Sequence, residues 1–378
     1  GLLWFGGNRD AQADNPHPPA QAIKLIFIHH SCGENWLADG HGRLGRALAK
    51  NNYFVSDTNY GWGPDSIGDR TDIVNWPEWF VGARAGRYLD ALYRENNRHS
   101  DYTRTGKDPG GANRIIMFKS CFPNSNLAGR PSDGPARGDG LTVSNAKAIY
   151  LQLLSYFRTR PDKLFIAVTA PPLLDNAHGA NARAFNRWLV KDWLTGYSGN
   201  NVAVFDFYNV LTGPDNHHRF RQGKIEYITN RGRNTLYYPT GSDEHPSPAG
   251  NRKATQEFVQ LLNVYYHRWV ESGEAAAVVE KPTVTASVQP QAEEATAPAP
   301  SETVAQETEA AQIATPPSGN MIDDFENEQL AWEVFSDTGK DTRLEFIRDT
   351  GQAHDSAAGL KIEYNIAPES WATCSLVY

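Results

Sequence analysis

Short apolar segments alternate with amphipathic segments through residues 1–270, and this alternation most limits what the chain can fold into. Patterns typical of buried strands occur at 23–29, 53–57, 114–119, 163–169 and 202–207. Helical spacing of apolar residues occurs at 37–50, 88–96, 144–157, 181–194 and 248–270. Strands that alternate with helices form a parallel sheet covered on both faces, so we predict an α/β fold with a doubly wound, five-stranded parallel sheet. We expect a long loop at 208–244.

The first of these strands ends abruptly in a cluster of reactive side chains. The segment from Ile23 to Asn35 reads Ile-Lys-Leu-Ile-Phe-Ile-His-His-Ser-Cys-Gly-Glu-Asn. In open parallel sheets, ligands bind beyond the carboxyl ends of the strands. We therefore expect the chemistry of this chain to lie around Ser31.

Charge and cysteine content argue against several classes of protein. Residues 1–270 carry a net charge of +7, whereas residues 271–378 carry −15. The Lys and Arg residues of the first part are scattered rather than clustered on one helix or face, which argues against nucleic-acid binding. Cys32, Cys121 and Cys374 are too few for a disulfide scaffold or a structural zinc site built from thiolates. No apolar run is long enough to span a bilayer.

Composition divides the chain into four parts. Residues 1–22 are an N-terminal lead-in, and residues 23–270 form the α/β domain. Residues 271–320 are rich in Ala, Glu, Thr and Pro and contain no aromatic residue, so we predict a disordered linker. Short alternating strands in 321–378 indicate part of an all-β sandwich, which we expect to be truncated. Linkers of this composition are common in extracellular modular enzymes, so we expect a secreted or cell-surface protein.

A second reactive cluster lies immediately before the last predicted helix, in the run Gly-Ser-Asp-Glu-His-Pro-Ser-Pro-Ala-Gly at 241–250. Nucleophilic catalysis by serine needs a base within hydrogen-bond reach and a carboxylate that orients the base. Ser31, Asp243 and His245 supply these three types of group in that chain order. No Gly-x-Ser-x-Gly pentapeptide occurs, which argues against the nucleophile elbow of the α/β-hydrolases.

With these motifs the chain resembles the SGNH/GDSL hydrolase family over about residues 23–265. Members of that family have a nucleophilic Ser after the first strand, a Gly after the second, an Asn after the third and a His near the end of the domain. The matching positions here are Ser31, Gly61 or Gly63, Asn124 and His245. The resemblance implies the flavodoxin-like sheet of that family.

The resemblance also implies acyl transfer without a cofactor or a metal ion. Ser31 attacks an ester carbonyl, and His245 acts as the general base. The oxyanion is held by the Ser31 N–H, by the N–H of Gly63 or of Gly61, and by the Asn124 amide.

The orienting acid departs from the family pattern. The family has an Asp three residues before the His, but Ser242 occupies that position here. The acid is therefore Asp243, Glu244 or absent.

Two C-terminal segments, 322–326 and 362–372, resemble jelly-roll carbohydrate-binding modules. Together with the hydrolase motifs they imply a secreted serine esterase that removes acyl groups, most commonly acetyl, from carbohydrate. Its partner is then an acylated polysaccharide or a small ester substrate. The alternatives are a lipid or aryl esterase with the same mechanism and a catalytically inactive sugar-binding surface protein.

Two cysteines follow strands that are neighbours in a flavodoxin-like order. In an oxidising compartment, Cys32 and Cys121 can form a disulfide that ties the Ser31 loop to the Asn124 loop. The alternative is a pair of small buried thiols.

Aromatic and histidine side chains near the cluster are candidates for substrate or metal binding. Trp36, Trp62 and His30 are expected to contact substrate, because flat apolar faces suit sugar rings. His29 and His30 alternate across the strand end, so only one of them can face the crevice. A metal site that combines one of them with His217 or His218 is the rival chemistry.

Overall fold

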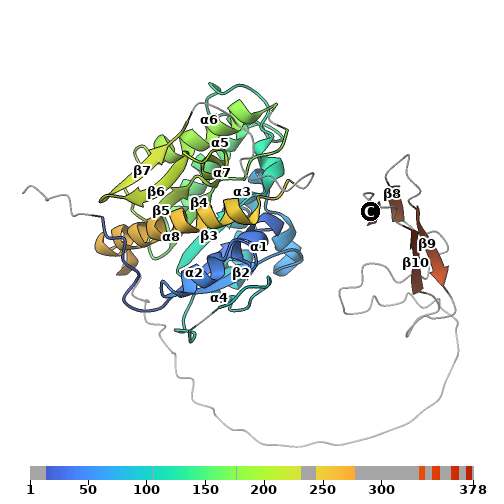
Figure 1. The fold of residues 1–378 in the computed structure, drawn as a ribbon, viewed down its shortest axis with the longest axis horizontal. Coiled ribbons are helices and arrows are strands. Elements are labelled where there is room, and N and C mark those ends of the chain that lie inside the picture. The colour runs from blue at the N-terminus through green and yellow to red at the C-terminus, as the bar shows by residue number, and fades with distance from the viewer. Residues whose placement is uncertain are drawn as a thin grey trace, which may run out of the picture. The chain divides into compact units, whose positions relative to one another are not determined.

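The protein is described by a computed structural model (Figure 1). The described residues are 14–104, 106–175, 177–230 and 244–276, together with the strands at 332–336, 343–349, 359–365 and 372–376. The chain divides into two compact units, Gly1–Ala286 and Ser287–Tyr378. Among the described residues, no helix is both long and apolar enough to cross a membrane.

Five parallel strands form the centre of the first unit, in the order β2-β1-β3-β4-β5. They are β1 (Ile23–Ile28), β2 (Tyr53–Thr58), β3 (Ile115–Lys119), β4 (Leu164–Val168) and β5 (Val202–Phe205). Nearly every residue in them is buried, which is why they read as continuous apolar runs rather than alternating ones. The predicted α/β fold, with its five-stranded, flavodoxin-like parallel sheet, is confirmed.

Helices pack on both faces of this sheet (Figure 1). One face carries α3 (Trp76–Phe80), α4 (Ala85–Arg94), α5 (Val143–Phe157) and α6 (Gly179–Lys191). The other carries α1 (Ser31–Leu37), α2 (Leu44–Ala49), α7 (Phe207–Leu211) and α8 (Pro248–Glu271). Successive strand residues enter opposite cores: Ile26 and Ile28 contribute to the first, Leu25 and Phe27 to the second.

The helix expected at 37–50 is wrong in its extent. The structure has two short helices there, and the first of them, α1, begins at Ser31. Between them the backbone passes close to α1, so that a Cβ at Gly42 would lie 2.3 Å from the Trp36 carbonyl oxygen. Only glycine fits this approach, and the turn separates the two helices.

The loop expected at 208–244 is also wrong over its described part. It contains α7 and an antiparallel hairpin of β6 (His217–Arg221) and β7 (Lys224–Ile228). Gln222 and Gly223 form its two-residue turn with φ of 51° and 77°, as hairpin turns of this length require. Polar and charged residues in both strands concealed the alternation that identifies a strand.

The second unit contains two antiparallel strand pairs, as expected for an all-β module. β8 (Trp332–Ser336) pairs with β11 (Ala372–Leu376), and β9 (Arg343–Asp349) pairs with β10 (Gly359–Asn365). Most of the predicted linker, from residue 277 to residue 320, and segment 322–326 lie outside the described residues.

Candidate active site

Two of the predicted catalytic side chains meet at the carboxyl end of the sheet. Ser31 is the first residue of α1, which follows β1, and His245 lies just before α8. The Nε2 atom of His245 is 2.7 Å from the Ser31 Oγ, although 214 positions separate them in the chain. The His245 ring also meets the Phe122 ring edge to face, with 5.3 Å between centroids. This is the hydrogen bond that a serine nucleophile needs to lose its proton.

A tight strand-to-helix turn presents Ser31. The carbonyl oxygen of His30 accepts hydrogen bonds from the N–H groups of Gly33 (2.8 Å) and Glu34 (3.1 Å), which starts the helix. A Cβ at Gly33 would lie 2.4 Å from the Cβ of His29, so the turn requires glycine at that position.

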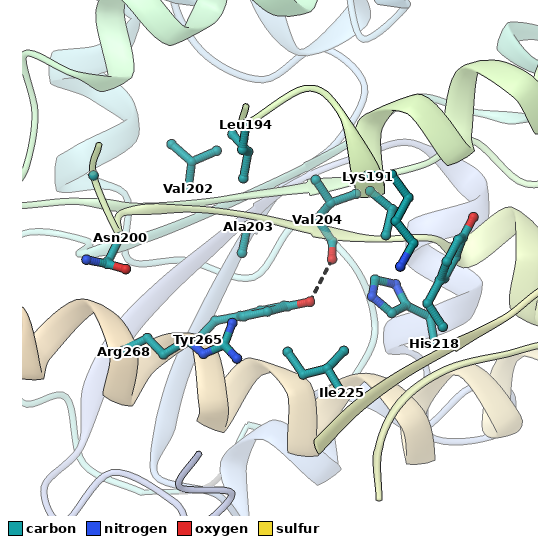
Figure 2. Close-up of a pocket in the computed structure, with 13 residues that line it drawn as sticks. Lys191, Leu194, Asn200, Val202, Ala203, Val204, His218, Ile225, Tyr265 and Arg268 are labelled. Atoms are coloured by element: carbon teal, nitrogen blue, oxygen red, sulfur yellow. Dashed lines mark hydrogen bonds between the residues drawn. The ribbon is translucent and has the colours of Figure 1, made fainter. Parts of the chain in front are cut away.

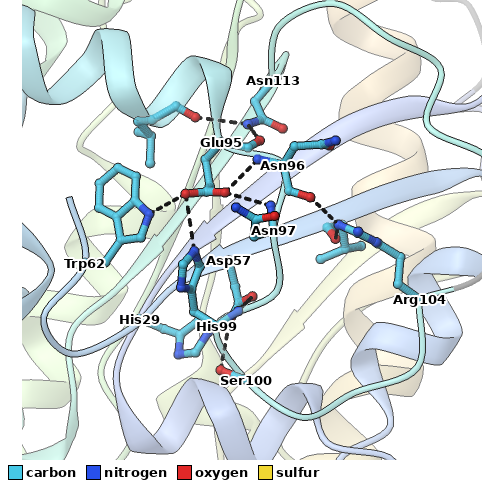
Figure 3. A network of polar contacts seen from close by, with 12 residues as sticks. His29, Asp57, Trp62, Glu95, Asn96, Asn97, His99, Ser100, Arg104 and Asn113 are labelled. Atoms are coloured by element: carbon cyan, nitrogen blue, oxygen red, sulfur yellow. Dashed lines mark hydrogen bonds and ion pairs between the residues drawn. The ribbon is translucent and has the colours of Figure 1, made fainter.

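His29 forms a buried ion pair below this turn (Figure 3). Its Nδ1 donates to the His30 carbonyl oxygen at 2.8 Å, and its Nε2 lies 3.1 Å from Asp57 Oδ2. Both partners are acceptors, so the imidazole satisfies both only with a proton on each nitrogen. The pair joins the ends of β1 and β2 beneath the nucleophile.

Asp57 is held as a carboxylate by three further donors. It accepts hydrogen bonds from the Ser100 hydroxyl (2.6 Å), the His99 N–H (2.8 Å) and the Tyr102 hydroxyl (3.1 Å). Burial raises the pKa of Asp57, but the His29 contact and the other donors outweigh it, so the pKa lies below its ordinary value. Neither His29 nor Asp57 is exposed to solvent, so this pair supports the turn rather than meeting substrate.

His30 is buried and neutral beside the nucleophile. Its Nε2 donates to the Gly68 carbonyl oxygen at 2.5 Å, and its Nδ1 accepts from the Thr71 hydroxyl at 3.1 Å. Burial lowers the pKa of the ring. The Tyr60 ring stacks on it, with centroids 3.9 Å apart and planes 21° from parallel. Both ring nitrogens are occupied, so His30 supports Tyr60 rather than offering a polar group to substrate.

The predicted oxyanion donors differ in their surroundings. The Asn124 Oδ1 accepts the Ile73 N–H at 2.7 Å, and its Nδ2 donates to Asp72 Oδ1 at 2.5 Å. The Gly61 N–H is taken up by Asp69 Oδ1 at 2.6 Å. The roles of Asn124 and Gly63 in the oxyanion hole stay predictions.

Gly63 has φ of 78° and ψ of −179°, a conformation open almost only to glycine. The same loop turns into the 3₁₀-helix at Pro64–Asp69. Turn geometry therefore accounts for glycine at this position.

Cys32 and Cys121 are free thiols, and each affects the pKa of the other. No disulfide joins them in the structure, although the predicted proximity is present. Cys32 is fully buried, and the Lys119 Nζ lies 3.7 Å from the Cys121 Sγ. The two predicted alternatives are therefore the oxidised state of this pair, a disulfide, and its reduced state, two buried thiols.

Trp36 and Trp62 do not present faces to substrate, contrary to expectation. Trp36 has no exposed surface, stacks on Phe207 and donates its Nε1–H to Thr255 at 2.9 Å. Trp62 stacks on Trp79 with planes 5° apart and donates to Glu95 at 2.6 Å (Figure 3). Both indoles are parts of the cores that flank the sheet.

Tyr60, which stacks on His30, is an exposed aromatic residue that was not predicted to lie at this site. Its side chain is 60% exposed. The signal available in the sequence was its position in a glycine-containing loop directly after the second strand.

The candidate orienting acids are Asp243 and Glu244, and the candidate metal ligands include His217 and His218. Asp243 lies outside the described residues, and Glu244 is half-buried next to His245. His217 and His218 lie on β6, where His217 contacts Glu257 at 2.7 Å and His218 accepts the Asp206 N–H at 2.9 Å. Within the described ranges, no three His, Cys, Asp or Glu side chains are grouped so that they can hold a metal ion.

A cavity of about 400 Å³ lies elsewhere, between β5, α6, the β6–β7 hairpin and α8 (Figure 2). Lys191, His218 and Tyr265 line it, and the Tyr265 hydroxyl donates to the Val204 carbonyl oxygen at 3.0 Å. Arg268 also lines it and is paired with Asp14 at 2.7 Å. None of the predicted catalytic residues borders this cavity.

No protein-family model matches the chain, and no curated protein matches it. A solved structure described as "The active site of a carbohydrate esterase displays divergent catalytic and non-catalytic binding functions" is similar to it at 14% identity, with a TM-score of 0.32. The match covers 66% of this chain and 68% of that chain.

Proposed function

We propose that this chain is a secreted serine esterase that hydrolyses ester groups, acetyl above all, on carbohydrate. The observation that carries the proposal is the 2.7 Å contact between His245 Nε2 and Ser31 Oγ at the carboxyl end of a parallel sheet. Ser31 attacks the ester carbonyl while His245 takes its proton, and the alcohol leaves with that proton. Water then hydrolyses the acyl-enzyme, with His245 again as the base.

The arrangement of α1 supports this role for Ser31. The N–H groups of the first helical turn have no acceptor within the helix, so the Ser31 N–H is available to an oxygen that develops negative charge. The buried pair of His29 and Asp57 stabilises the strand-to-helix turn that carries Ser31. The proposed carbohydrate substrate rests on the resemblance of the C-terminal segments to carbohydrate-binding modules, and secretion on the linker composition.

Hydrolysis of p-nitrophenyl acetate and of acetylated xylan, measured for the wild type, Ser31→Ala and His245→Ala, tests the proposal. We expect each variant to lose activity by about 10⁴-fold or more on both substrates. Activity that survives Ser31→Ala would refute the mechanism. Activity on aryl esters alone would favour the lipid or aryl esterase, and a wild type inactive on every ester would favour a sugar-binding protein.

A further inference from the structure

The cavity of about 400 Å³ beside β5 has a positively charged lining (Figure 2). β5 is an edge strand of the five-stranded sheet, so its outer side borders the cavity instead of another strand of that sheet. Lys191 and Arg268 are among the lining residues, whereas no described Asp or Glu is. The cavity therefore favours a ligand that carries negative charge.

His218 provides a hydrogen-bond donor in the wall of this cavity. Its Nδ1 accepts the Asp206 N–H at 2.9 Å, so the ring proton is on Nε2. Burial lowers the pKa of His218 to about 3, and the ring is neutral at pH 7. The side chain is only 2% exposed, and no described residue accepts the Nε2–H. A buried N–H that lacks an acceptor is costly, so an acceptor oxygen in the cavity is favoured.

Lys191 places a positive charge on the same wall. Its Nζ lies 5.1 Å from the centroid of the Tyr227 ring, and the His218 ring meets that ring with 5.2 Å between centroids. Lys191 forms no ion pair with a carboxylate in the described part of the chain. Arg268, by contrast, is paired with Asp14 at 2.7 Å. The uncompensated charge of the lining is therefore the Lys191 ammonium group, close to the His218 donor.

One carboxylate, Asp206, lies behind this wall but does not line the cavity. Its Oδ2 accepts the Tyr227 hydroxyl at 2.7 Å. Its Oδ1 accepts the Thr169 hydroxyl and the Asn209 N–H, each at 3.0 Å. Both oxygens have donors within the protein, so Asp206 does not take up the Lys191 charge.

We propose that this cavity binds a small organic acid. Its carboxylate accepts a hydrogen bond from His218 Nε2 and pairs with the Lys191 ammonium group, and a charge-assisted contact of this kind is among the stronger hydrogen bonds. The body of the acid lies against the aliphatic side chains of Leu194 and Ile225. The volume lies in the range of small-molecule sites. This site is separate from the Ser31–His245 pair and does not depend on the proposed esterase function.

Isothermal titration calorimetry with two acids tests the proposal. D-glucuronate probes for a sugar acid and benzoate for an aromatic acid, and D-glucose is the uncharged counterpart of glucuronate. We expect a Kd of about 1 mM or lower for at least one of the acids, and no binding of glucose. Lys191→Met should raise that Kd by about tenfold or more.

The matched control is Lys50→Met, which makes the same change in net charge at an exposed lysine that follows α2 and does not line this cavity. It should leave the Kd unchanged. The kcat on p-nitrophenyl acetate should be the same in both variants and in the wild type. As a second measurement, the assigned nitrogen and proton signals of the His218 ring should shift in NMR spectra of the wild type as the acid is added.

The other outcomes overturn the inference. Kd values above about 10 mM for both acids would refute the site. Glucose that binds as tightly as glucuronate would show that no carboxylate is recognised, and inorganic phosphate that competes equally well would indicate a general anion site. Equal effects of Lys191→Met and Lys50→Met, or His218 signals that do not move, would place the binding elsewhere. Binding of only one of the acids supports the proposal and identifies the class of its ligand.

Discussion

The two thiols beside Ser31 differ in how readily they ionise. Burial raises the pKa of Cys32 well above its usual range. A hydrogen bond from Cys32 and the nearby Lys119 ammonium lower the pKa of Cys121. Cys121 is also the more exposed of the two, so it is the thiolate that reacts first with an external electrophile.

We expect iodoacetamide to alkylate Cys121 at a pH well below that at which an ordinary thiol reacts, at about 8 to 9. Lys119→Met removes the neighbouring positive charge and should shift the reaction profile to higher pH. The measurement is mass spectrometry of the peptide that contains Cys121, as a function of pH, with Cys121→Ser as the control. A profile insensitive to Lys119→Met would contradict this account.

Asp243 and Glu244 are the candidates for the carboxylate that orients His245. A carboxylate that holds the imidazole in its working tautomer contributes about 10³-fold or more to kcat in serine hydrolases. If Asp243 has this role, Asp243→Asn should lose about that factor on p-nitrophenyl acetate, whereas Glu244→Gln should stay near the wild-type rate. The reverse pattern would identify Glu244, and a small effect of both variants would indicate a Ser–His dyad.

At the scale of elements, the ends of β1 and β2 and the segment at 99–102 are joined by the carboxylate of Asp57 (Figure 3). The strand pairing alone does not determine where the turn after β1 goes. The His29 ring fixes the path of this turn, because it hydrogen-bonds the His30 carbonyl oxygen. The same oxygen accepts the first backbone hydrogen bonds of α1. Loss of the Asp57 carboxylate deprives the buried His29 ring and the donors at 99–102 of the charged acceptor that they share.

We therefore expect Asp57→Asn to lower the free energy of unfolding at pH 7 by about 3 kcal/mol. The pKa of Asp57 is lower in the folded state than in the unfolded chain, so its contribution is complete above about pH 4 and is lost as pH falls through the folded value. Urea unfolding of wild type and variant at pH 7 and near pH 3.5 measures this. The difference between them should shrink at the lower pH, and an equal difference at both would contradict the ion pair.

At the scale of the whole molecule, the α/β unit and the β unit form separate compact bodies. The two hydrophobic cores on either side of the sheet are built from residues between Ile23 and Ala275. The proposed Ser31–His245 pair lies within the same range.

Removal of residues 277–378 should therefore leave the melting temperature of the α/β unit and its kcat/KM on p-nitrophenyl acetate unchanged. If the second unit binds carbohydrate as proposed, the shortened chain should lose retention on insoluble polysaccharide in a pull-down assay. Differential scanning calorimetry and the soluble ester assay serve as controls for folding and catalysis. A large fall in activity on the soluble ester would show that the two units depend on each other.

Local patterns determined the α/β class, the five strands and the segments that carry Ser31 and His245. Strands buried on both faces must be apolar at nearly every position, so each of them is visible in the sequence without knowledge of its partners. The hairpin of β6 and β7 was missed because its strands are largely polar and only partly buried. The start of α1 was missed because its N-cap residue, His30, is not one of the usual capping types and makes no side-chain capping hydrogen bond.

What the sequence by itself determined is the sheet, its order as implied by the resemblance, and the two residues of the proposed Ser–His pair. Only the tertiary structure decided how the residues around this pair are used: Trp36 and Trp62 are core, His29 pairs with Asp57, and Tyr60 stacks on His30. The reason is physical. Periodicity depends on a residue's own segment, whereas burial and hydrogen-bond partners depend on side chains brought together from distant parts of the chain.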